Sequence, residues 1–182
     1  SISHRALLFG ALAEGEQRVI GLAPGADVAS TRSVLEALGA TIRRDGDAWI
    51  VSGSGARDLR ASSAPLDCGN SGTTMRLLSG TLAGLGLEAT LVGDASLSRR
   101  PMERVAAPLR RMRATVETTD GHAPVHLRGG SPLKAIEHRN PELAFTEMSR
   151  FIDRSSKYLS SRHPDVMSKT VRWQDADGLS AP

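Results

Sequence analysis

The sequence predicts an α/β fold in which one helix–strand–helix–strand–strand unit occurs twice. The first observation is an internal repeat: matching residues lie 71 positions apart early in the unit (Arg5 and Arg76) and 76 apart at its end (Gly53 and Gly129). The second is the alternation of helical and strand periodicities in each copy, which is typical of sheets backed by helices. A repeat of this length indicates one supersecondary structure used again.

The first copy begins with a helix that Ser1 or Ser3 would cap and that ends near Gly15. A strand, a second amphipathic helix and a hairpin follow, and the hairpin turns at an Asp-Gly pair, which accepts positive φ readily. These three elements are expected at residues 18–22, at residues 27–38 and on both sides of Asp45-Gly46.

The second copy repeats this order, and a short strand is expected to lead into the first helix of each copy. Its first helix starts after Asn70 or Ser71 and ends near Gly86. Its strand, second helix and hairpin are expected at residues 89–92, at residues 101–112 and on both sides of Asp120-Gly121.

Two residues of the second copy carry specific backbone expectations. Pro101 suits the first position of the second helix, because it lacks the N–H group that would have no partner there. Arg113 stands where the first copy has Gly39. If that position requires positive φ, arginine costs roughly 1 kcal/mol more than glycine.

The repeat defines one partial domain over residues 1–141. Its units are expected at about 1–62 and 63–130, and residues 133–139 are typical of the entry strand of a third.

The composition changes after Pro141. Of the 18 glycines, only Gly178 lies in the last 41 residues. One amphipathic helix is expected from about residue 142 to 161, and the polar remainder to residue 182 is expected to be loop.

The composition is that of a soluble globular protein, with 40% hydrophobic and 24% charged residues. No apolar run approaches the roughly 20 residues that cross a bilayer, so no membrane partner is expected. The chain opens in mid-motif at Ser1 without a signal pattern, and we expect a truncated N-terminus. Its one cysteine, Cys68, excludes an internal disulfide, and a cytoplasmic location is expected.

The basic residues are unevenly spread, although the net charge is only +3. A small nucleic-acid-binding module is one interpretation, but aromatic residues make up only 3% of the chain, so stacking platforms are scarce. Small anionic substrates explain a local arginine cluster equally well, and no nucleic-acid partner is expected. The clustered arginines are Arg99, Arg100, Arg104, Arg110, Arg111 and Arg113.

Three loops offer donors for an anion. In residues 69–74 (GNSGTT), glycines let backbone N–H groups approach an anion, and the following helix adds partial positive charge. Residues 93–102 (GDASLSRRPM) place two arginines before a helix, and arginine binds carboxylate or phosphate with two parallel bonds. Residues 1–5 (SISHR) combine hydroxyls, an arginine and a helix start. Ordinary capped turns and a solvated basic turn stay open as alternatives.

Other reactive side chains carry no recognisable site. Cys68 and His4 are interpreted as packing or surface residues, because no base partner is identified for the thiol. His122, His126 and His138 lack the spacing of a ligand cluster, so no metal is expected.

Taken together and in this order, the three loops resemble the EPSP synthase (3-phosphoshikimate 1-carboxyvinyltransferase) family of enolpyruvyl transferases. The family pattern is Asp-Lys-Ser-x-Ser-x-Arg, then Gly-Asn-x-Gly-Thr-x-x-Arg, then Gly-Asp-x-Ser-x-x-x-Arg-Pro-Met, and only the first two residues are missing here. The resemblance covers residues 1–141 and implies a partial inside-out α/β barrel, built from two of three units. Residues 142–182 do not resemble the family.

The resemblance implies transfer of the enolpyruvyl group of phosphoenolpyruvate to shikimate 3-phosphate, a step of aromatic amino acid biosynthesis. It implies no metal and no organic cofactor. The residue roles it implies are shikimate 3-phosphate binding by Ser1 and Arg5, phosphoenolpyruvate binding by Gly72 and Thr73, a catalytic clamp on phosphate or carboxylate by Arg100, and loop support by Asn70 and Arg76.

The chain departs from the family at several points. The lysine before Ser1, a Ser-Ala-Gln or Ser-Ser-Gln motif soon after Pro141, and the second domain are not in this sequence. We therefore expect the chain alone to lack turnover, and a catalytically inactive anion-binding fragment is the alternative function.

Overall fold

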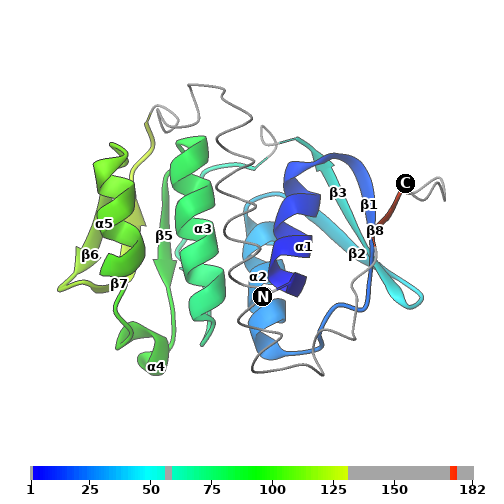
Figure 1. Ribbon diagram of the computed structural model, residues 1–182, viewed down its shortest axis with the longest axis horizontal. Coiled ribbons are helices and arrows are strands. Elements are labelled where there is room, and N and C mark those ends of the chain that lie inside the picture. The colour runs from blue at the N-terminus through cyan, green and yellow to red at the C-terminus, as the bar shows by residue number, and fades with distance from the viewer. Residues whose placement is uncertain (1, 56–58, 131–172, 176–182) are drawn as a thin grey trace, which may run out of the picture.

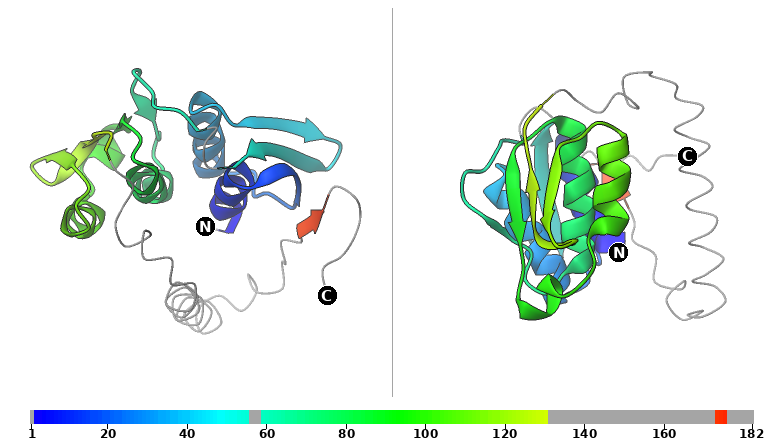
Figure 2. Two further views of the ribbon diagram at one scale, coloured as in Figure 1. Left: turned by 90° about the horizontal axis from the view of Figure 1, so that it is seen from above. Right: turned by 90° about the vertical axis from the view of Figure 1, so that its left-hand side faces the viewer.

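The structure is a computed structural model that describes residues 2–55, 59–130 and 173–175. Each repeat contributes strands to its own four-stranded sheet, which packs with its helices. The helices α1 (Ile2–Leu12), α2 (Ala26–Ala37) and α3 (Gly72–Leu85) lie between the two sheets, as Figure 1 and the view from above in Figure 2 show. The α/β fold class expected from the sequence is confirmed.

The first copy has the predicted order of elements. A helix, a strand, a second helix and a hairpin follow one another as α1 (Ile2–Leu12), β1 (Glu14–Ile20), α2 (Ala26–Ala37), β2 (Thr41–Asp45) and β3 (Ala48–Ser54).

The second copy repeats this order with two additions. A short strand leads into its first helix, as predicted, and a one-turn helix precedes its second long helix. The elements are β4 (Leu66–Asp67), α3 (Gly72–Leu85), β5 (Ala89–Val92), α4 (Ala95–Ser98), α5 (Glu103–Arg111), β6 (Val116–Thr119) and β7 (His122–Leu127).

The two sheets share one topology. The order β2-β3-β1 in the first copy corresponds to β6-β7-β5 in the second, and neighbouring strands in both triplets are antiparallel. The sequence repeat is therefore a structural repeat, whereas the exact unit boundaries at 62 and 63 stay a prediction.

A fourth strand joins each sheet at the matching edge, but from different parts of the chain. In the second copy β4 pairs in parallel with β5, and in the first copy β8 (Trp173–Asp175) pairs antiparallel with β1. The expectation of loop after residue 161 is wrong for these three residues, because main-chain pairing along β1 depends little on side-chain pattern. The expected strand at 133–139 and helix at 142–161 lie outside the described residues.

The hairpins turn where the Asp-Gly pairs predict. Two-residue loops join Asp45 to Ala48 and Thr119 to His122. Asp120 and Gly121 have φ of +51° and +78°, the pattern of a type I′ turn. Arg113 has φ of +70° where Gly39 has +103°, so the strained arginine expected from the repeat is present.

Three local details differ from the expectations. Pro101 does not begin a helix, since α5 starts only at Glu103 with Met102 as its N-cap residue, and the Met102 N–H donates to Gly121 O (2.7 Å). Of the two residues expected to cap α1, Ser3 lies inside the helix, where its Oγ accepts from the N–H of Ala23 (3.1 Å), and Ser1 lies outside the described residues. The strand expected at 18–22 is β1, which begins earlier because residues 14–17 also pair with β3.

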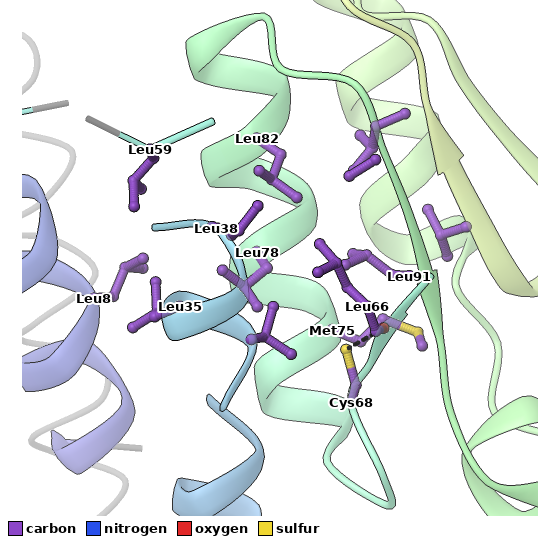
Figure 3. Close-up of a cluster of buried hydrophobic side chains, with 14 of the residues drawn as sticks. Leu8, Leu35, Leu38, Leu59, Leu66, Cys68, Met75, Leu78, Leu82 and Leu91 are labelled. Atoms are coloured by element: carbon purple, nitrogen blue, oxygen red, sulfur yellow. Dashed lines mark hydrogen bonds between the residues drawn. The ribbon is translucent and has the colours of Figure 1, made fainter. Parts of the chain in front are cut away.

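One hydrophobic core joins the two copies (Figure 3). Leu8 of α1, Leu35 of α2 and Leu38, the residue that caps the end of α2, are buried in the same cluster as Met75 and Leu78 of α3. Each such side chain contributes roughly 1.5–3 kcal/mol when fully buried. The copies therefore fold against each other, which fixes the amino ends of α2 and α3 relative to one another.

Among the described residues, none of the helices combines the length and the apolar character that a membrane span requires.

Candidate anion-binding site

The amino end of α3 follows a tightly bonded loop. Ser71 is the N-cap residue, and its Oγ accepts from the N–H of Thr74 (3.2 Å). Gly69 has φ of +56°, and its N–H donates to Asp67 Oδ1 (2.8 Å). The first-turn N–H groups of a helix lack intrahelical partners and carry partial positive charge, so this end can hold an anion.

Asp94 ties this loop to the following one. Its N–H donates to Gly69 O (2.9 Å), its Oδ1 accepts from the Leu97 N–H (2.7 Å) and its Oδ2 accepts from the Asn70 side-chain amide (2.8 Å). The Asn70 amide, the Leu97 N–H and nearby Arg100 lower the pKa of Asp94, so the carboxylate stays ionised and keeps these bonds.

Two arginines converge on Gly72. A Cβ atom placed there would lie 2.7 Å from one terminal nitrogen of Arg76 and 3.4 Å from one of Arg100. Arg100 donates to Asn70 Oδ1 (2.6 Å), and Arg76 donates to Pro101 O (3.3 Å). We call Asn70, Gly72, Arg76 and Arg100 the cradle, because two guanidinium groups and a helix amino end meet without an intervening side chain.

An open pocket of about 540 Å³ lies beside the cradle and is lined by Arg76, Arg100, Pro101, Arg104 and Val105. The nearby acid of α5 does not neutralise it. Glu103 instead pairs with Arg110 (2.8 Å) and accepts from Thr118 (2.9 Å), and these bonds lower its pKa. The pocket therefore keeps the positive charge of three arginines.

A buried hydroxyl network connects the cradle helix to the first copy. Thr74 Oγ1 lies 2.7 Å from both Ser71 Oγ and Thr31 Oγ1, and it donates to Asp27 O (3.2 Å). Thr31, Ser71 and Thr74 are at most 2% exposed. These bonds position the α3 amino end against α2.

The α1 residues expected in the site are only partly placed. Ser1 lies outside the described residues. Arg5 is the fourth residue of α1 and makes no hydrogen bond or ion pair with the cradle in the described part of the chain. His4 is 5% exposed, and burial lowers its pKa, so the interpretation as a packing histidine holds.

The other reactive groups are structural. Cys68 is buried, and burial together with the charge of Asp67 raises the pKa of its thiol to about 12, which removes a nucleophilic thiolate near neutral pH. Over residues 2–55, 59–130 and 173–175 there is no group of three or more His, Cys, Asp or Glu side chains arranged to hold a metal ion.

The structure brings together the predicted Asn70, Gly72, Thr73, Arg76 and Arg100 around the start of α3. The sequence analysis did not single out Asp94 and Thr31 as site residues, and it named Arg104 only as a member of the arginine cluster. The local sequence does signal Asp94, because an Asp directly before a helix is a typical N-cap residue whose carboxylate accepts from a first-turn N–H. Thr31 has no such signal, because its partner Thr74 lies 43 residues away.

The fold and this site define a repeated α/β domain with helix amino ends and arginines that can hold small anions. Comparison with known proteins specifies the class. The family model for EPSP synthase (3-phosphoshikimate 1-carboxyvinyltransferase) matches residues 1–143. The 3-phosphoshikimate 1-carboxyvinyltransferase of Koribacter versatilis is 51% identical over 141 residues, and that of Halorhodospira halophila is 51% identical over 143. Each match covers 78% of this chain and 33% or 32% of the relative.

A solved EPSP synthase from Acinetobacter baumannii superposes with a TM-score of 0.69 at 43% identity, over 72% of this chain and 30% of that one. The chain belongs to the EPSP synthase family, and its two repeats form part of the inside-out α/β fold. It spans about a third of the length of the curated relatives it matches.

Proposed function

We propose that this chain is part of an enolpyruvyl transferase that acts on phosphoenolpyruvate and shikimate 3-phosphate, and that the cradle holds phosphoenolpyruvate. The convergence of Arg76 and Arg100 on Gly72 at the start of α3 carries the proposal. Phosphoenolpyruvate bears a phosphate and a carboxylate on one small carbon frame. Two guanidinium groups and the positive amino end of α3 match this charge pattern.

Within the proposed site, each residue has a distinct task. The Gly72 and Thr73 backbone lines the ligand, and Gly72 leaves the space that a Cβ would take from both arginines. Arg100 clamps the phosphate or carboxylate, and its bond to Asn70 fixes its direction. Arg76 holds the two loops together through Gly72 O and Pro101 O.

Ser1 and Arg5 are proposed to hold shikimate 3-phosphate. The support is chemical, since a hydroxyl and a guanidinium are typical phosphate donors. Contacts of α1 with α2, and of α2 with α3, keep the helix that carries Arg5 in a fixed relation to the cradle.

Binding of phosphoenolpyruvate to the 182-residue chain, measured by calorimetric titration, tests the cradle. Arg100→Ala removes a charged donor worth about 1.5–3 kcal/mol, so affinity is expected to fall about tenfold or more. Arg99→Ala is the matched control, because Arg99 is the exposed neighbour of Arg100. Equal losses of phosphoenolpyruvate affinity in both variants, or no binding by the unaltered chain, would show that the cradle is not the binding site.

Turnover is a separate question from binding. We propose that the 182-residue chain alone releases no phosphate from phosphoenolpyruvate in the presence of shikimate 3-phosphate, because the chain spans about a third of its relatives. Each missing general acid or base is typically worth about 10²–10⁴-fold in rate. Phosphate release that disappears in Arg100→Ala would show instead that the chain assembles a working site.

A nucleic-acid-binding module is less well supported. Arg110, part of the arginine-rich region, is held by Glu103 and Thr118 and by Val116 O (2.6 Å). The N–H groups of Arg110 therefore bond within the protein and are not available to a nucleic-acid phosphate.

A further inference from the structure

A second pocket lies in the first copy, away from the cradle residues. It occupies about 380 Å³ between the start of α2, the loop that follows β1 and the β2–β3 hairpin. Its apolar lining includes Leu7, Leu22, Val28 and Trp49, and its charged lining comprises Arg32, Arg44 and Asp47. Pockets for small molecules typically occupy roughly 300–1,000 Å³ and combine apolar walls with a few polar groups.

Both arginines lie near the ring of Trp49. The Arg32 Cζ is 4.8 Å from the ring centroid and the Arg44 Cζ is 5.6 Å from it. Arg44 is paired with Trp49 across the hairpin, whereas Arg32 comes from α2. Such cation–π contacts orient a guanidinium without using its N–H donors.

Within the described residues, most N–H donors of these two arginines have no protein acceptor. The Arg32 Nε is buried without a hydrogen-bond partner, because the nearest acid oxygen, Glu36 Oε1, is 3.8 Å away. The Arg44 Nε donates to Gly46 O (3.1 Å), which leaves its two terminal nitrogens without a protein acceptor there.

The pocket carries excess positive charge. Among the described residues that line it, Asp47 is the one acid, and Asp47 Oδ1 accepts from Arg18 (3.3 Å), which also pairs with Asp45 (2.9 Å). Outside the lining, Glu36 forms an ion pair with the Arg32 Nε at 3.8 Å. Arg32 and Arg44 therefore face an apolar wall without a carboxylate of their own in hydrogen-bond contact.

We propose that this pocket binds a small carboxylate that has a planar apolar body. The guanidinium groups match a carboxylate with two parallel hydrogen bonds, and Leu22 and Val28, which line the same pocket as Trp49, offer an apolar surface for a flat ring. A bare phosphate leaves the apolar wall unused. A neutral ring leaves both guanidinium groups unpaired.

Trp49 fluorescence in the 182-residue chain provides the assay. The Trp173→Phe background makes Trp49 the only tryptophan, since the sequence contains two. Benzoate is the probe, and benzyl alcohol and inorganic phosphate supply the ring and the charge separately. Saturable quenching by benzoate is expected, with at least about tenfold weaker effects of the other two compounds.

Variants locate the binding. Arg32→Gln and Arg44→Gln are each expected to weaken benzoate binding about tenfold. Arg43→Gln is the matched control, because Arg43 neighbours Arg44 on β2 but pairs with Glu16 (3.3 Å). Circular dichroism confirms that each variant is folded.

Three outcomes would overturn the proposal. The first is no saturable quenching up to about 10 mM benzoate, roughly ten times the weakest affinity typical of metabolite sites. The second is unchanged affinity in both Arg32→Gln and Arg44→Gln. The third is loss of benzoate binding in Arg100→Ala, which would place the probe in the cradle instead. If the cradle does not bind phosphoenolpyruvate, the prediction for this pocket is unchanged, because the two sites share no residue.

Discussion

Removing the Thr31 hydroxyl tests whether the buried network positions the cradle helix. Thr31→Val keeps the side-chain shape but deletes the 2.7 Å bond to Thr74 and the 3.4 Å contact with Asp27 O. Water cannot replace the hydroxyl, because Thr31 is 2% exposed. Thr74 keeps Ser71 and Asp27 as partners, so we expect a loss of about 1–1.5 kcal/mol in the free energy of unfolding.

The reciprocal substitution is expected to cost more. Thr74→Val deletes three contacts and leaves the Thr31 hydroxyl with only its long contact to Asp27 O, so about 2–3 kcal/mol is expected. Because both variants delete the shared bond, the double variant is expected to lose about 1 kcal/mol less than the sum.

Urea unfolding of the 182-residue chain and its three variants measures this coupling. Thr41→Val, an exposed threonine at the start of β2, is the control and is expected to stay within about 0.5 kcal/mol. Additive losses in the double variant, or a Thr31→Val loss no larger than that of the control, would refute the network as the link between the two copies.

Three further predictions concern single positions. Burial lowers the pKa of His4, so the unfolded state binds the proton more readily and the free energy of unfolding is expected to fall as the pH drops below about 6.5. In His4→Gln, the urea midpoint should depend less on pH over this range. The same pH dependence in the variant and the unaltered chain would contradict this prediction. The Cys68 thiol, with its pKa raised to about 12, is expected to react with iodoacetamide at pH 8 only on unfolding, and labelling as fast as that of a free cysteine would show that it is accessible. Gly53→Ala places a Cβ against the carbonyl oxygen of Ala13 and is expected to lower the free energy of unfolding by at least about 2 kcal/mol. Gly80→Ala meets open space within α3 and is expected to raise it by about 0.5–1 kcal/mol. Similar melting temperatures of the two variants would contradict this contrast.

Local chemistry in the sequence predicts most of the elements. The repeat, the Asp-Gly turns and the apolar periodicities give both hairpins, the long helices and the equivalence of Gly39 with Arg113. Errors arise where a distant part of the chain helps to set where an element begins. Met102 is the N-cap residue of α5 and its N–H donates to Gly121 O, and nothing in the local sequence signals that partner.

The candidate site divides in the same way. The glycines, hydroxyls and arginines of the three loops are visible as residue types suited to anions, and the order of the motifs identifies the family. Their convergence is not visible, because Asn70 meets Arg100 across 30 residues and Asp94 across 24.

By itself, the sequence determined which loops carry residue types suited to anions and which segments form most of the helices and strands, since these depend on nearby residues. Only the tertiary structure decided that Arg76 and Arg100 meet at Gly72, that Thr31 supports α3, and that Trp173–Asp175 pairs with β1. The physical reason is that core packing and main-chain pairing join residues far apart in the chain, and their free energy depends on the whole fold.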